Sequence, residues 1–250
     1  MKENFVKTAL LALILVTAVL TGVARAEIIV VAVDGADGFA PGDTLDRTVP
    51  LVLPAGARLT LLSKAGELST LDGPYDGLIG ALQFGAESDG NDDDWGAVKA
   101  FLGQENDPLK VVGASRNADG DVPPTPGVWH VSIDSSGPRC TRADALTFWR
   151  RNTDETLSLS LRNASSKIKG LAWAAGQEFL TVPRGFSIET GRMIVSSENG
   201  LRELELHVIE NAEYGKSNGR LFAWLVRSGC TRQALALIKN IHVNGPILKQ

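Results

Sequence analysis

The sequence predicts a mainly β protein, built from a small β module, a β-sandwich and a C-terminal helical segment. Three observations predict this class. Short apolar runs separated by Gly, Pro and Asp recur roughly every 8–10 residues over residues 27–80, which is typical of strands joined by tight turns. A second set of short alternating runs fills residues 126–212. Strong helical periodicity appears after residue 213.

Residues 1–26 have the composition of a secretory signal peptide. Lys2 and Lys7 give a basic start, the apolar run ALLALILVTAVL follows, and ARA ends at Ala26 with the small residues that a signal peptidase prefers. The run is shorter than the ~20 apolar residues that span a bilayer, although retention as a signal anchor stays open. We therefore expect export, to the periplasm if the source has two membranes, and a mature chain without a transmembrane segment.

The composition of the mature chain is acidic and otherwise ordinary. Residues 1–26 carry three basic residues and one acidic residue, so their removal shifts the formal net charge from −4 to −6. Nucleic-acid phosphates need a basic surface, so we expect no nucleic-acid partner. An apolar content of 44% and a charged content of 22% exclude intrinsic disorder of the whole chain.

The first predicted strand is EIIVVAVDG, a run of β-branched residues at the start of the small β module, residues 27–80. An acidic and Pro-rich linker, residues 81–125, follows this module. Within it, DDDWGAVKAFLG predicts a short helix, because aspartates favour a helix N-terminus and the apolar side chains share one face.

Residues 126–212 are predicted to form the β-sandwich. Six runs carry the strand pattern: VWHVSI, LTFWR, LSLSL, EFLTVP, MIVSS and LRELELHVI. The strict alternation of LSLSL places Leu157, Leu159 and Leu161 on the inner face.

The helical segment, residues 213–250, is expected to pack on the sandwich. It contains two apolar stretches at helical spacing, separated by Ser228 and Gly229. Gly229 suits the left-handed cap of the first helix. The pair of helices lacks the basic face that a DNA-binding helix-turn-helix needs.

Several stretches resemble known families. RSGCTRQALALIKN, WHVSIDSSGPRC, LTFWRR and WAAGQEFLTVP resemble a group of uncharacterised exported bacterial proteins, and this resemblance implies no activity. LVLPAGARLTLLSKAGELSTLDGPYDG, within residues 27–80, resembles FecR-type periplasmic modules, which implies a regulatory or scaffolding role. FecR-type regulators usually cross the membrane, which this mature chain is not expected to do.

The two cysteines, Cys140 and Cys230, are expected to form a structural disulfide. Export delivers them to a compartment where cysteines oxidise. A bond between them closes about 90 residues, which stabilises a fold by roughly 4–4.5 kcal/mol in the chain-entropy model. Two alternatives stay open: a reactive thiol at Cys230, beside Arg227 and Arg232, and buried free thiols.

Three tryptophans, Trp129, Trp149 and Trp173, fall in or beside the predicted sandwich strands. Indoles in a sandwich usually fill the core. If Trp129 and Trp173 are instead exposed and coplanar, they form a candidate ligand surface for a carbohydrate or an envelope polymer.

The sequence gives little sign of a metal or catalytic site, and we expect no cofactor. SDGNDDDW begins like a calcium loop, but Asp94 stands where the loop needs Gly and Ala100 where it needs Glu, so only a looser site stays open. His130, Ser132 and Asp134 are the one local cluster with a hydrolase-like composition, and a shared polar strand face explains it equally well.

These patterns predict an exported, non-enzymatic interaction or regulatory protein of the bacterial cell envelope. We expect it to bind an envelope protein through strand edges or through the N-terminal module. The alternative hypothesis is a module that binds envelope carbohydrate or another ligand, and the third hypothesis is a hydrolase.

Overall fold

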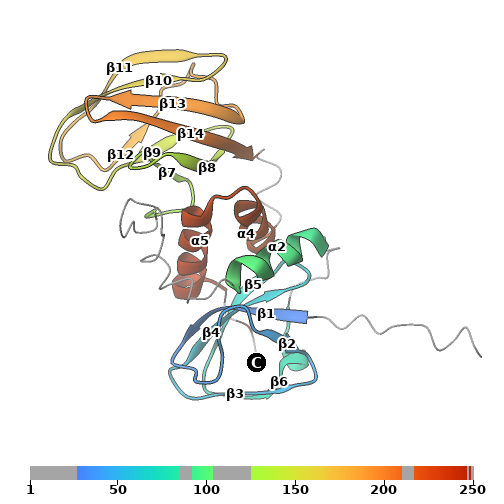
Figure 1. Cartoon of the computed structure of the whole chain (residues 1–250). Helices are drawn as coiled ribbons and strands as arrows, with labels where there is room; N and C mark the ends of the chain where they lie inside the picture. Colours follow the sequence, from blue (N-terminus) through green and yellow to red (C-terminus); the bar gives the residue numbers. More distant parts are fainter. Residues whose placement is uncertain (1–26, 85–91, 104–124, 210–216, 247, 249–250) are drawn as a thin grey trace, which may run out of the picture.

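The structure is a computed structural model that describes residues 27–84, 92–103, 125–209, 217–246 and 248. It confirms the mainly β class with a small β module, a sandwich and two C-terminal helices. The β module and the sandwich lie at opposite ends of the molecule, with the helices between them (Figure 1). The predicted signal peptide and much of the linker lie outside the described residues.

The N-terminal unit consists of six strands and a short 3-10 turn: β1 (Glu27–Asp34), β2 (Thr44–Asp46), β3 (Pro50–Leu53), β4 (Arg58–Ser63), β5 (Leu68–Asp72), β6 (Tyr75–Leu78) and η1 (Ile79–Ala81). Four strands form an antiparallel sheet in the order β2-β1-β4-β5, and β3 pairs with β6 in a separate ribbon. Ile28 and Val30 of β1 pack in the core with the ribbon, whereas Ile29 and Val31 pack in the core with the helices. A continuous run of β-branched residues suits such a strand, because both of its faces are covered.

The sandwich consists of eight strands: β7 (His130–Ser132), β8 (Gly137–Arg142), β9 (Thr147–Trp149), β10 (Leu157–Arg162), β11 (Lys167–Trp173), β12 (Phe179–Thr181), β13 (Gly191–Ser197) and β14 (Gly200–Ile209). One sheet has the order β11-β10-β13-β14-β8, and the other has the order β12-β9-β7. The pairs β8–β14 and β7–β9 are parallel. Leu157, Leu159 and Leu161 are buried in the core between the sheets, as the alternation of LSLSL predicts.

Three helices complete the described fold: α2 (Asp92–Leu102), α4 (Asn218–Arg227) and α5 (Thr231–Asn244). The helix predicted within the linker is confirmed as α2, and its Val98 and Leu102 are buried. Phe101 of α2 meets Phe222 of α4 edge-to-face, with 5.9 Å between the ring centroids. Among these helices, none is long and apolar enough to cross a membrane.

The position of the C-terminal helices corrects the prediction that they pack on the sandwich. α5 contacts β1, β4 and β5, so it covers the second face of the N-terminal sheet. That face is apolar and would otherwise be exposed to solvent, so covering it with α5 stabilises the fold. The contact of α5 with the sandwich is made by its first turn, beside Cys140 of β8.

Candidate functional site

The predicted disulfide is confirmed between Cys140 on β8 and Cys230, which immediately precedes α5. Both cysteines are buried, and neither is a free thiol, so the reactive-thiol alternative loses its support. The buried Gln233 side chain reinforces this junction. Its Oε1 accepts a hydrogen bond from the Cys140 amide at 2.8 Å, and its Nε2 donates to the carbonyls of Cys140 at 2.6 Å and Val128 at 2.7 Å. Gln233 thus pairs with the outer edge of β8 as a neighbouring strand would.

The candidate ligand surface of Trp129 and Trp173 needs correction. Trp173 is completely buried in the sandwich core, so it cannot present a platform to solvent. Trp129 is half-buried and packs against a different cluster, the one around the helices. The physical reason is that Trp173, at the end of β11, faces inward and fills the space between the sheets.

The structure does not join His130, Ser132 and Asp134 into a catalytic arrangement. The His130 ring lies against Phe179, with 4.5 Å between the centroids, and burial lowers the pKa of this histidine. Ser132 is buried, and its hydroxyl accepts a hydrogen bond from the Asp134 amide at 3.2 Å. In the described chain, His130 Nδ1 has no hydrogen-bond partner.

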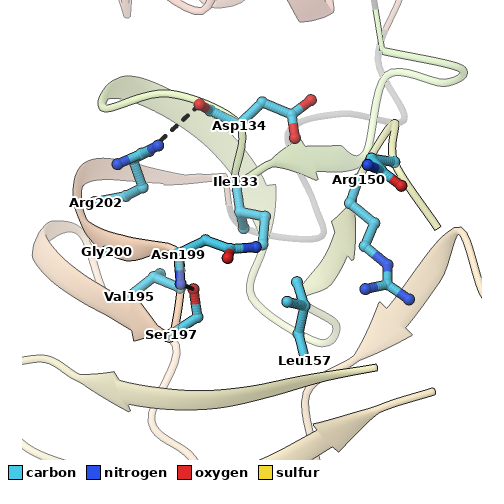
Figure 2. Close-up of a pocket in the computed structure, with 10 residues that line it drawn as sticks. Ile133, Asp134, Arg150, Leu157, Val195, Ser197, Asn199, Gly200 and Arg202 are labelled. Atoms are coloured by element: carbon cyan, nitrogen blue, oxygen red, sulfur yellow. Dashed lines mark hydrogen bonds between the residues drawn. The ribbon is translucent and has the colours of Figure 1, made fainter. Parts of the chain in front are cut away.

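A pocket of about 190 Å³ opens where the two sheets of the sandwich meet (Figure 2). It is lined by Ile133, Asp134, Arg150, Asn152, Leu157, Val195, Ser197, Asn199, Gly200 and Arg202. The topology explains why these residues converge. Because β7 and β9 are parallel, the residues that follow them lie at the same end, where β10 begins and the β13–β14 hairpin turns.

Arg150 forms one side of this pocket, and its guanidinium is held rigidly. The residue is 2% exposed, and its guanidinium lies over the Trp173 ring, 4.8 Å from the centroid. Three backbone carbonyls accept its hydrogen bonds: Gln177 from Nε at 3.1 Å, Glu155 from Nη1 at 2.7 Å and Ala174 from Nη2 at 2.7 Å. No carboxylate among the described residues forms an ion pair with it. Arg150 therefore joins the β9–β10 loop to the β11–β12 loop, and its charge is not neutralised by any described carboxylate.

Arg202 lies on the opposite side of the pocket, as Figure 2 shows, with Asn199, Ile133 and Leu157 between the two arginines. Its Nε donates to the Asp134 carbonyl at 3.3 Å, and its Nη1 donates to the Leu201 carbonyl at 3.1 Å. This arginine is only partly buried, so it can adjust to an occupant.

A third arginine, Arg139, holds the segment of chain that carries Asp134. Arg139 is buried and donates to the carbonyls of Ser132, Ser135 and Pro138. Burial, together with the charge of Arg232, lowers the pKa of Arg139 to about 10, and Asp134 acts in the opposite direction. Arg139 is therefore protonated at neutral pH. Asp134 contributes the one carboxylate on the pocket wall.

A second hollow, of about 370 Å³, lies in the N-terminal unit beside the end of α5. Arg58 forms a bidentate ion pair with Asp72, and its Nη1 donates to the His242 carbonyl at 2.8 Å. His242 Nδ1 lies 2.8 Å from the Thr60 hydroxyl. Burial lowers the pKa of His242, as does Arg58, whereas Asp34 and Asp72 raise it. These polar groups fasten the last turn of α5 to the sheet.

The residues that the structure describes contain no group of three His, Cys, Asp or Glu side chains that could hold a metal ion. The stretch SDGNDDDW, for which the sequence leaves only a looser calcium site open, lies partly outside the described residues. No family model matches the chain, and comparisons with curated proteins and with solved structures also gave no match. The resemblances that the sequence suggests therefore stay predictions.

Proposed function

We propose that the chain is an exported, non-enzymatic binding protein of the bacterial cell envelope, and that the pocket at the end of the sandwich is its recognition site. One observation carries this proposal: Arg150, whose guanidinium is fixed by three carbonyls and forms no ion pair among the described residues, lines a pocket with an apolar floor. A concave site with an apolar floor and a few oriented polar groups is the usual form of a binding site.

The composition of the pocket favours binding over catalysis. Its titratable side chains are Asp134, Arg150 and Arg202, and arginine keeps its proton at neutral pH. Ser197, the one hydroxyl on the wall, accepts a hydrogen bond from the Asn199 amide at 3.2 Å, and no histidine lines the pocket. A nucleophile therefore lacks the adjacent base that would activate it.

Export is supported by two features. Residues 1–26 have the composition of a signal peptide. Cys140 and Cys230 form a buried disulfide, which is consistent with an oxidising compartment outside the cytosol.

A ligand-observed NMR screen with anionic, neutral and cationic fragments tests the recognition site. Ser197→Phe fills the pocket from β13, and Ser158→Phe adds the same ring to the exposed surface of neighbouring β10. We expect fragment binding to disappear in Ser197→Phe and to persist in Ser158→Phe. Fragments that bind both variants as they bind the parent chain would contradict the proposal.

A second candidate function is contact with an envelope protein through the N-terminal module. Val52 is 62% exposed and Leu78 is 51% exposed, and they lie on one face of the β3–β6 ribbon, beside the exposed Val49. Figure 1 shows this ribbon at the end of the molecule remote from the sandwich. Exposed apolar residues that gather in one place are typical of a protein interface.

Cross-linking in envelope extracts tests this second candidate. We expect the double variant Val52→Ser, Leu78→Ser to lose specific cross-linked products. Leu201→Ser, which removes an equally exposed leucine from the sandwich, should retain them. Equal loss in both variants would show that general surface hydrophobicity is responsible.

A further inference from the structure

Several hydrogen-bond donors on the wall of the pocket at the end of the sandwich have no acceptor among the described residues, and Asp134 Oδ2 on the same wall has no donor there. A guanidinium has five N–H donors, and Arg150 uses three of them on backbone carbonyls. Arg202 Nη2 donates to no acceptor among the described residues, whose contacts with this side chain are those of Nε and Nη1. Asn152, which also lines the pocket, accepts a hydrogen bond from the Asp154 amide at 2.8 Å through Oδ1, and its side-chain N–H groups donate to no acceptor among the described residues.

The charges around the pocket favour an anion. Arg150 and Arg202 face it from opposite sides, and Asp134 carries the one carboxylate on its wall. Arg139 lies close enough to Asp134 to interact with it electrostatically. The two arginines on the wall outweigh the single carboxylate, so the net positive charge favours an anion.

The floor and the size of the pocket restrict the chemical group to which the negative charge is attached. Leu157 and Val195 are buried beneath it, and Ile133 borders it, so an aliphatic group finds apolar contacts there. A volume of about 190 Å³ is many times the roughly 10–15 Å³ that one water molecule needs by the same measure. The site therefore admits a small molecule, or one end of a larger one.

The binding groups are already in place. Stacking on Trp173 and three carbonyl bonds fix the orientation of the Arg150 guanidinium before any ligand arrives. An oriented guanidinium loses little side-chain entropy when it binds an anion. The planar pair of oxygens in a carboxylate matches the planar fork of N–H donors in arginine.

We propose that this pocket binds a carboxylate carried by a short aliphatic group. The proposal rests on the proposed recognition site and names the chemistry of its ligand. The carboxylate can belong to a free acid or to the C-terminus of a peptide, and both sources share the same contacts with Arg150 and Arg202.

Ligand-observed NMR titrations test this chemistry with three probes: isovalerate, its neutral isostere isovaleramide, and inorganic phosphate. We expect isovalerate to bind at least about tenfold more tightly than isovaleramide, because hydrogen bonds to a charged group stabilise more than neutral ones. N-acetylvaline mimics the end of a peptide. Tighter binding of N-acetylvaline than of isovalerate assigns the site to chain ends, and the reverse order assigns it to free acids.

Matched arginine variants locate the contact. Arg202→Met should weaken isovalerate binding roughly tenfold to a hundredfold. Arg151→Met removes the same charge from an exposed residue outside the pocket and should leave the affinity unchanged. Because Arg202 makes few contacts with the rest of the fold, the test does not depend on replacing Arg150.

Five results would overturn the proposal. Equal binding of isovalerate and isovaleramide would show that charge is not recognised, and tighter binding of phosphate would show that the anion class is wrong. Equal weakening by Arg202→Met and Arg151→Met would indicate a nonspecific electrostatic effect. If neutral fragments bind the pocket and carboxylates do not, this proposal fails while the recognition site stands. If no probe or fragment binds there, both fail.

Discussion

At the scale of single residues, buried polar side chains hold together segments that are distant in the sequence. Arg150 joins two loops of the sandwich through carbonyl groups. Gln233 joins α5 to β8 and to Val128. Each such group is fully desolvated, so its loss leaves buried partners without hydrogen bonds.

We predict that Gln233→Ala lowers the free energy of unfolding by roughly 2–4 kcal/mol, because the Cys140 amide and two carbonyls lose their partner. Urea unfolding with the disulfide intact measures the effect. Gln177→Ala is the matched control, since the exposed side chain of Gln177 can be removed with a change within about 0.5 kcal/mol. Similar small changes in both variants would show that the Gln233 contacts contribute little.

A second prediction at this scale concerns His242. Its pKa is lowered in the folded chain by burial and by Arg58, so the unfolded chain binds the proton more readily. The stability from neutral His242 is complete above its unfolded pKa, about 6.5, and is lost as the pH falls toward the lower folded pKa. We expect unfolding at a series of pH values to show a smaller loss on acidification in His242→Gln than in the parent chain. An equal or larger loss in the variant would contradict this assignment.

At the scale of elements, alternation predicted most strands of the sandwich, and the exceptions have clear causes. All six predicted runs lie on strands, but β8 and β11 had no recognisable pattern. β8 has the sequence GPRCTR, and its inward positions include a buried arginine; β11 places Lys167, Lys169 and Gly170 on an exposed edge. Charged residues and glycine are typical of edge strands, where they discourage further pairing. In β11 the apolar side chains of Ile168 and Leu171 both pack against the core, but they are three positions apart because the pairing with β10 shifts register between them, so simple alternation fails.

The approach of α4 to the N-terminal sheet gives a prediction for two glycines. A methyl group on Gly219 would collide with the Gly66 carbonyl and with Leu62, whereas a methyl group on Gly96 of α2 would meet nothing within 4 Å. We expect Gly219→Ala to lower the free energy of unfolding by about 1–3 kcal/mol. Gly96→Ala should raise it by about 0.5–1 kcal/mol, since alanine is the better helix former. Stabilisation by both substitutions in thermal unfolding would show that α4 does not lie this close to the sheet.

At the scale of the whole molecule, the recognition site depends on chain topology, and this limits what the sequence could reveal. Arg150 and Arg202 are 52 positions apart, and no motif joins them. One local signal was present. Arg150 directly follows β9 and lies two positions after the buried Phe148, so strand alternation predicts that its charged side chain points toward the core. The cysteine pair could be predicted because export and count restrict the choices. The placement of the C-terminal helices could not be predicted from the sequence, because both the small β module and the sandwich offered an apolar surface on which they could pack.

The most direct measurement of the central claim is backbone amide shift mapping of the ¹⁵N-labelled chain during titration with isovalerate. The account predicts saturable shifts at residues 150–157 and 195–202, the segments that form the pocket. Shifts concentrated on the β3–β6 ribbon, or the absence of saturable shifts around the pocket, would contradict the claim that the end of the sandwich is the recognition site.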